Sequence, residues 1–218
     1  MRSFIITCLL ILIGTNSAAQ TRYEVAGDTL YLDMRAEALG YKLTRQLEFY
    51  DVRLLSEYLF EYPEIQKLNV TGLGGHMGAA LEMARDLSGH GIDTIASGKC
   101  FSACAMVFLG GRSRTLSPDA KLGFHRQWVN SEEHKENYTL LKENMGLKDE
   151  FDYLMYIYNK LNSELIAQLT FMIDQDVSVD FIMKALATEI WDMWIPSKHE
   201  LLAAGVISRL SHYSESFD

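Results

Sequence analysis

The alternation of short apolar runs with amphipathic segments between residues 68 and 125 constrains the fold of this chain most strongly. Residues 68–70 and 92–96 have the length and apolar character of buried strands. Between them, apolar residues recur with helical spacing at Met77, Ala80, Leu81, Ala84 and Leu87. Strands that alternate with helices favour parallel pairing through crossover helices, so the sequence predicts an α/β fold with a largely parallel sheet.

The segments on either side extend this pattern. Extended runs at 23–26 and 29–33 are joined by Gly27 and Asp28, which suit the turn of a hairpin. Further along, Asp51 is predicted to cap a helix. The carboxy-terminal half is predicted to be helical, because residues 151–172 carry a broad apolar stripe typical of core packing or of a subunit interface.

The amino terminus has the composition of a signal peptide. An apolar run over residues 4–13 is followed by the small residues Ser17 and Ala19, which predicts cleavage after Ala19. The run is shorter than the roughly 20 residues that a membrane-spanning helix needs, which favours a cleaved signal peptide. The alternative is an uncleaved amino-terminal anchor. We therefore expect a signal peptide at residues 1–19, a single domain at residues 20–218, and a periplasmic or secreted protein whose membrane association is left open.

Charge and cysteine usage limit the partners and cofactors. The 218 residues include 20 basic and 29 acidic ones, a formal net charge of -9 without a basic cluster, which argues against nucleic acid or an anionic membrane surface as a partner. With Cys8 in the expected signal peptide, Cys100 and Cys104 remain in a compartment that permits disulfides. Two cysteines are too few for a structural zinc site and no histidines have metal-ligand spacing, so no metal or cofactor is predicted.

Three segments at predicted strand ends have the residue types that catalysis requires: 72–75, 100–104 and 123–125. Glycines before a helix offer backbone N–H groups to an anion, Ser102 at a helix start suits a nucleophile, and His125 at a strand end suits a general base. Each also has a plain structural interpretation, as a turn, a helix cap or a packed histidine. Together they supply the three roles that acyl transfer needs.

At these residues the sequence resembles the Clp protease (ClpP)/crotonase superfamily, specifically its exported Clp-protease-like members. The resemblance runs from about residue 68 to residue 207 and rests on Gly74-Gly75, Ser102, Leu122-Gly123-Phe124-His125 and the segment 200–207. It implies a spiral of ββα units with a mainly parallel sheet and a helical carboxy-terminal half. It also implies a homo-oligomer formed through the later helices.

The resemblance assigns roles to individual residues. It implies Ser102 as the nucleophile, His125 as the general base, and the N–H groups of Gly75 and Ala103 as the oxyanion hole. Asp192 begins the segment that matches the family's aspartate, with one inserted residue, and is predicted to orient the histidine. The alternatives are two aspartates closer to the histidine in sequence, Asp174 and Asp176.

The leading expectation is an exported serine hydrolase, peptidase-like, that acts on a peptide or acyl substrate through an acyl-enzyme. The alternatives are a catalytically inactive scaffold for assembly or binding, and a crotonase-type acyl-thioester enzyme. Cys100 and Cys104 flank Ser102, and our hypothesis is a disulfide that fixes the turn at the serine, with two buried thiols as the alternative. Their Cα atoms are expected near the upper end of disulfide reach.

Overall fold

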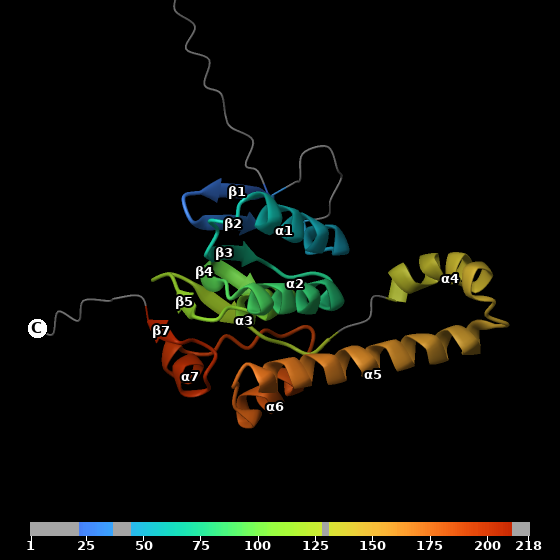
Figure 1. Cartoon of the computed structure of the whole chain (residues 1–218). Helices are drawn as coiled ribbons and strands as arrows, with labels where there is room; N and C mark the ends of the chain where they lie inside the picture. The colour runs from blue at the N-terminus through green and yellow to red at the C-terminus, as the bar shows by residue number, and fades with distance from the viewer. Residues whose placement is uncertain (1–21, 37–44, 128–130, 211–218) are drawn as a thin grey trace, which may run out of the picture.

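The computed structural model describes residues 22–36, 45–127 and 131–210, and its frame is one sheet flanked by helices (Figure 1). The sheet has seven strands in the order β1-β2-β3-β4-β5-β7, with β6 paired to β4. The strands are β1 Tyr23–Ala26, β2 Thr29–Asp33, β3 Lys67–Gly72, β4 Asp93–Phe101, β5 Arg114–Leu116, β6 Lys121–Gly123 and β7 Arg209–Leu210. The helices are α1 Phe49–Glu61, α2 Met77–His90, α3 Ala103–Leu109, α4 Ser131–Met145, α5 Glu150–Asp174, α6 Val179–Ala187 and α7 Lys198–Ala203.

The predicted α/β class with a mainly parallel sheet is confirmed. Strands β1 and β2 form the expected antiparallel hairpin, whereas the other strand pairs of the sheet are parallel. Strand β4 is longer than the predicted 92–96 because it has two successive partners along one edge. Its first half pairs with β5 (Thr94 with Arg114) and its end pairs with β6 (Phe101 with Gly123).

The core lies between the sheet and helices α1, α2 and α3, which Figure 1 shows side by side. Every residue of α3 is buried, as expected for a helix that is apolar all round. The hydroxyl of Thr94 in β4 donates to the Phe108 carbonyl in α3 at 2.6 Å, which ties the end of α3 to the sheet. These contacts place the start of α3 at the carboxyl end of β4.

Helices α4 and α5 extend away from the sheet (Figure 1). Helix α5 confirms the helical prediction for residues 151–172, but much of its apolar stripe is exposed, including Phe151, Leu154, Tyr158 and Ile166. Its carboxy-terminal end packs into the core through Phe171 and Met172. In the part of the chain that the structure describes, no helix has both the length and the apolar character to cross a bilayer.

Helix α1 begins differently from the prediction. Asp51 is not its cap: the helix starts at Phe49 after Glu48, and Asp51 lies in the first turn with no exposed surface. Its carboxylate accepts the Glu48 N–H at 2.9 Å and also binds a buried arginine, Arg22. The prediction was wrong about the cap position: Glu48 is the cap residue, and Asp51, three residues later, completes its capping box. The cationic partner of Asp51, 29 residues away, carries no signal in the sequence spacing.

Candidate active site

Ser102 links β4 to α3 with a backbone conformation that L-residues rarely adopt. Its φ and ψ are 55° and -124°. The Ser102 N–H donates to the Gly123 carbonyl at 2.8 Å, and the Ser102 carbonyl accepts the Ala105 N–H at 2.9 Å, so hydrogen bonds hold both sides of the turn. Such a conformation costs about 1–3 kcal/mol, and strained strand-to-helix turns present the nucleophile in one large group of hydrolases.

The Ser102 side chain makes no capping hydrogen bond to α3, although it occupies the cap position. The residue is only partly buried. Ala103 is the first residue of α3, so its N–H has no acceptor within the helix. The turn therefore presents a hydroxyl that is not used as a cap, next to a backbone N–H donor.

The glycine loop before α2 packs directly on this turn. Gly74 has φ 106°, and a Cβ added to it would lie 2.8 Å from the Ser102 Cβ and 3.1 Å from the Ala103 nitrogen. Gly75 has φ 146°, and a Cβ there would lie 2.3 Å from the backbone nitrogen of Leu47. Both positions require glycine, because a side chain would collide with backbone on either side of the loop.

Leu47 holds this loop from behind through a parallel bridge to Gly75. The Leu47 N–H donates to the Gly74 carbonyl at 2.8 Å, and the Leu47 carbonyl accepts the His76 N–H at 2.8 Å. Both bonds use groups that flank Gly75, so the Gly75 N–H takes no part in this pairing. No sequence pattern indicated Leu47, because its role depends on backbone pairing alone.

His125 follows the strand next to the one that ends at Ser102. Strands β4 and β6 are parallel, their last pair is Phe101 with Gly123, and His125 lies two residues beyond it. His125 and Ser102 therefore lie past the carboxyl ends of neighbouring strands. The described part of the structure contains no hydrogen bond between their side chains. Catalytic hydrogen bonds are often long without a substrate.

The His125 ring has a defined hydrogen-bond partner. Its Nδ1 lies 2.7 Å from the Arg126 carbonyl oxygen. Since a carbonyl can only accept, Nδ1 carries the proton in this contact, and in the neutral ring Nε2 is left as an acceptor. This is the tautomer that a general base requires.

Asp192 is brought to the same region by pairing of the backbone. Phe124, next to His125, forms an antiparallel bridge with Trp194, with N–H···O distances of 2.9 and 3.0 Å. The Asp192 side chain is exposed, and its Oδ1 accepts the N–H of Met193 at 2.8 Å. The loop thus lies beside the histidine, while the Asp192 carboxylate accepts a hydrogen bond from the backbone of the next residue.

The two alternative aspartates lie elsewhere. Asp174 is the last residue of α5, and the Asp176 carbonyl packs against Gly205, 2.5 Å from where its Cβ would be. Burial lowers the pKa of the Arg114 guanidinium, and the negative charge of Asp176 acts in the opposite direction. Arg114 begins β5 and pairs with Thr94, near the amino end of β4. Ser102 follows the opposite end of that strand.

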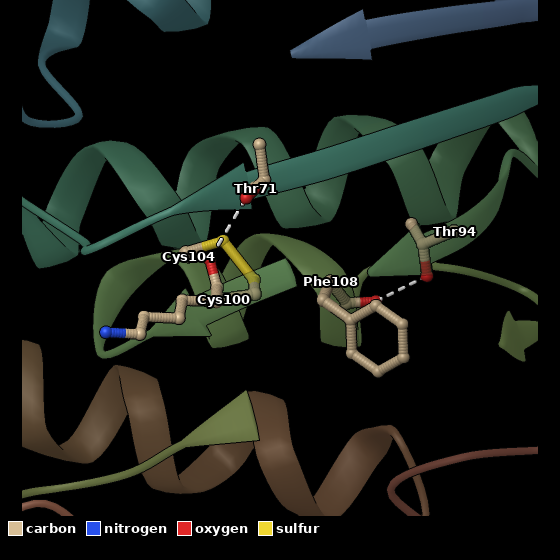
Figure 2. The surroundings of a disulfide bond; sticks show 6 residues. Thr71, Thr94, Cys100, Cys104 and Phe108 are labelled. Carbon is tan, nitrogen blue, oxygen red and sulfur yellow. Dashed lines mark hydrogen bonds between the residues drawn. A yellow bond between two sulfur atoms is a disulfide. The ribbon is translucent and has the colours of Figure 1, made fainter. Parts of the chain in front are cut away.

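A disulfide joins Cys100 and Cys104 across the serine turn (Figure 2). The two Cα atoms are 5.1 Å apart, well inside the usual range and closer than expected from the sequence. The reason is the positive φ of Ser102, which folds the chain back where a helix would have separated the cysteines. Both cysteines are fully buried. The bridge closes the segment on which Ser102 lies.

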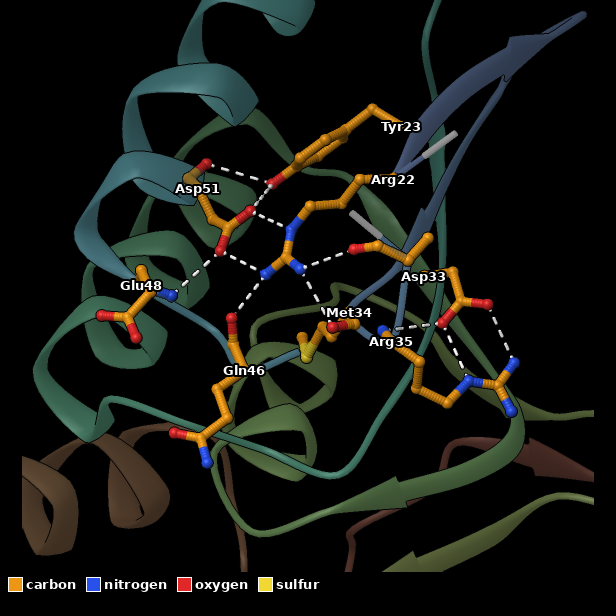
Figure 3. A network of polar contacts seen from close by, with 9 residues as sticks. Arg22, Tyr23, Asp33, Met34, Arg35, Gln46, Glu48 and Asp51 are labelled. Carbon is orange, nitrogen blue, oxygen red and sulfur yellow. Dashed lines mark hydrogen bonds and ion pairs between the residues drawn. The ribbon is translucent and has the colours of Figure 1, made fainter. Parts of the chain in front are cut away.

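The structure also shows residues that the sequence patterns did not indicate. Arg22 and Asp51 form a buried ion pair with the Tyr23 hydroxyl beside it (Figure 3). A single arginine before a predicted strand carries no periodic signal, so nothing in the sequence selected it. Within the described ranges, no group of three His, Cys, Asp or Glu side chains is arranged to hold a metal ion.

Comparison with known proteins finds similarity among solved structures alone. No protein-family model and no curated protein sequence matches the chain. Among solved structures, the chain is similar to a mutant of ClpP1 from Listeria monocytogenes, with 14% sequence identity and a TM-score of 0.49. The match covers 78% of this chain and 88% of the other.

Proposed function

We propose that this protein is an exported serine hydrolase of the ClpP/crotonase type, peptidase-like in its chemistry, with Ser102 as nucleophile. The observation that carries the proposal is the Ser102 turn, which is strained, uncapped by its own side chain and packed against the Gly74 loop. His125 follows the adjacent strand with its Nδ1 already bonded. Strain of this kind clusters at functional sites because the surrounding structure must maintain it.

In the proposed reaction each group has a defined role, and His125 acts in both the acylation and the hydrolysis steps. The substrate carbonyl oxygen accepts hydrogen bonds from the N–H groups of Gly75 and Ala103, which stabilise the negative charge that develops on it. The Ser102 oxygen attacks the carbonyl carbon while the Nε2 of His125 takes the hydroxyl proton. The imidazolium then donates that proton to the leaving amine or alkoxide. Water, deprotonated by His125, releases the acid product and restores Ser102.

Asp192 is proposed to stabilise the imidazolium during these steps. Its support is the Phe124–Trp194 bridge, which carries the Asp192 loop alongside His125. To act, the carboxylate has to leave the Met193 N–H and bind a ring nitrogen. The Arg126 carbonyl fills that position in the structure, so His125 keeps an oriented ring without Asp192.

Labelling with a fluorophosphonate tests the proposal. The purified protein is expected to react, whereas Ser102→Ala and His125→Ala lose labelling. Ser97→Ala is the matched control, because Ser97 lies on the same strand and only its hydroxyl bond to Ser117 is lost. Folded protein without Ser102-dependent labelling would overturn the hydrolase and leave the inactive scaffold. Hydrolysis of an acyl thioester that survives Ser102→Ala would instead support the crotonase-type alternative.

We further propose that the protein is a homo-oligomer that buries the exposed apolar face of α5. Phe151 is 67% exposed and Leu154 61% exposed, and burial of such side chains favours association. Sedimentation of wild type is expected to show an oligomer that Leu154→Lys dissociates. Lys160→Ala, a change on the same helix that removes a charged side chain rather than an apolar one, is expected to leave it intact. A monomeric wild type would contradict this.

Export remains part of the proposal. The predicted signal peptide, residues 1–19, lies outside the described residues. Mass spectrometry of protein recovered from the cell envelope or the medium is expected to find a chain that begins at Gln20. An intact residue 1 on membrane-bound protein would instead support the uncleaved anchor.

A further inference from the structure

The Arg22 guanidinium is completely enclosed and all of its donors are used. Its Nε and one terminal nitrogen donate to the two Asp51 oxygens, both at 2.7 Å. The remaining hydrogens bind the carbonyls of Met34, Ala36 and Gln46 at 2.9, 3.1 and 2.7 Å. These five bonds match the five N–H donors of the side chain, and Arg22 is only 2% exposed.

The Asp51 carboxylate is equally well satisfied. Besides Arg22, it accepts the Glu48 N–H at 2.9 Å, and the Tyr23 hydroxyl lies 3.3 Å from its Oδ1 and 3.1 Å from the Asp51 backbone carbonyl oxygen. Burial raises the pKa of the Tyr23 hydroxyl, and the negative charge of Asp51 raises it further. Tyr23 therefore stays protonated and remains a donor to Asp51. We call these three side chains, Arg22, Tyr23 and Asp51, the buried cage (Figure 3).

The buried cage holds one short backbone segment from both sides. Arg22 binds the carbonyl of Gln46, and Asp51 binds the N–H of Glu48. Leu47 lies between these two anchored groups and is itself fully buried. Its backbone position is thus set by two charge-assisted hydrogen bonds, which are the stronger class in proteins.

Leu47 transmits this position to the glycine loop. Its N–H and carbonyl pair with Gly74 and His76, each at 2.8 Å. Its backbone also lies where a Gly75 side chain would be, so the loop cannot move back without displacing Leu47. Any shift of residues 46–48 therefore shifts the peptide that carries the Gly75 N–H.

A role in positioning also accounts for the chemistry of the cage. Burying a charged pair is expensive, and well-packed apolar side chains of the same volume often give equal or greater stability. What an apolar replacement cannot do is hold the Gln46 carbonyl and the Glu48 N–H in one orientation. The hydrogen bonds of the cage are directional, and they act on the backbone segment that lies behind the glycine loop.

From these contacts we infer that Arg22 and Asp51 are positioning residues for the oxyanion hole, acting through Leu47 on the Gly75 N–H. The inference rests on the proposed function for its catalytic consequence. The hairpin and the start of α1 then form part of the active site's support. Oxyanion donors lose effect steeply when misplaced, and an error of about 1 Å can cost on the order of 100-fold in rate.

The test compares Asp51→Asn with Leu87→Ala in the purified protein. Asp51→Asn keeps the shape of the side chain and removes its charge. Leu87→Ala removes buried apolar volume about three turns into α2, at the end of the helix opposite to the glycine loop, and serves as the control for lost stability. Both variants are measured for the rate of fluorophosphonate labelling and for hydrogen exchange of the peptide covering residues 72–78, well below their melting temperatures.

We expect Asp51→Asn to label at least tenfold more slowly and to exchange faster in residues 72–78, with Leu87→Ala like wild type in both. Equal exchange in Asp51→Asn and Leu87→Ala would overturn the inference, whatever the labelling shows. Faster exchange with unchanged labelling would overturn the catalytic part. If the wild-type protein is not labelled, the proposed function is contradicted, and the hydrogen-exchange comparison still tests the positioning role. If Asp51→Asn does not fold, Arg22→Lys, which keeps the charge but supplies fewer donors, takes its place.

Discussion

Gly74 and Ser102 are packed so closely that a Cβ on Gly74 would lie 2.8 Å from the Cβ of Ser102. The same added atom would lie 2.9 Å from the Phe101 carbonyl oxygen. The glycine loop and the serine turn, 28 residues apart in sequence, thus constrain one another's backbone. Neither can relax without moving the other.

Gly74→Ala is expected to slow Ser102-dependent labelling strongly. Its Cβ would push the serine turn away, and φ 106° is itself strained for alanine. We expect a loss on the order of 100-fold in labelling rate, following from misplacement of the reacting groups. The rate of fluorophosphonate labelling measures it, at a temperature where the variant is folded by circular dichroism.

Gly89→Ala is the matched control for this change. Gly89 lies in α2, and a Cβ added there has nothing within 4 Å. Alanine at this helical position is expected to raise stability by about 0.5–1 kcal/mol and to leave labelling unchanged. Full labelling of folded Gly74→Ala would mean that the serine turn is not held by the glycine loop.

Loss of the disulfide is expected to lower the labelling rate of Ser102 strongly while the protein stays folded. The double variant Cys100→Ala, Cys104→Ala opens the segment that holds Ser102 in its strained conformation. The chain-entropy account of so small a loop gives about 2 kcal/mol of stability. Labelling of the folded double variant should fall well below that of wild type, because Ser102 can relax to an ordinary conformation.

The bridge itself is checked by mass. Because both cysteines are buried, the protein is unfolded before alkylation. Without reductant it should carry no label on Cys100 or Cys104, and after reduction it should carry label on both. Two alkylated thiols without reductant would show that the bridge is absent. If fluorophosphonate labels the double variant at the wild-type rate, the disulfide has no role in holding Ser102.

Asp192→Asn is expected to slow labelling by much less than the roughly 10⁴-fold seen when an aspartate alone orients the histidine of a triad. The reason is the Arg126 carbonyl, which already holds Nδ1 of His125 at 2.7 Å. Asp174→Asn, at the carboxy-terminal end of α5, is the control and should react like wild type. The measurement is the pH-dependent labelling rate of the three proteins. No slowing in Asp192→Asn would take Asp192 out of the mechanism.

Arg114→Met is expected to destabilise the protein by several kcal/mol without affecting the site. The buried guanidinium donates to carbonyls of Leu109, Gln175 and Gly205 at 3.2, 3.0 and 2.8 Å. Its removal leaves these acceptors buried without a partner, at about 1–3 kcal/mol each. Urea unfolding followed by circular dichroism measures the change.

Arg112→Met is the control for Arg114. Arg112 is also an arginine near the start of β5, but its side chain is 66% exposed and pairs with Asp93 at the surface. Such pairs contribute little, so the free energy of unfolding should change by less than about 1 kcal/mol. Similar losses in the free energy of unfolding in both variants would contradict the expected role of Arg114, which is to connect β5 with the end of α5 and the loop before β7.

Much of the frame was predictable from the sequence because it depends on local patterns. The hairpin at residues 23–33 and the helix that begins at Met77 both follow from spacing and turn chemistry, and the structure confirms each. The end of β4 did not follow from such patterns. Its last residues are a strand because β6 pairs with them, and that partner comes about 20 residues later.

For the site, the sequence by itself supplied the residue types and their order: glycines, serine and histidine at the ends of successive elements. Only the tertiary structure decided the geometry. It packs Gly74 on Ser102, joins Cys100 and Cys104 in a disulfide, and leaves the Asp192 carboxylate bonded to the Met193 N–H. It alone revealed Arg22. The physical reason is that periodicity reports local burial, whereas backbone strain and buried ion pairs depend on contacts between segments far apart in the chain.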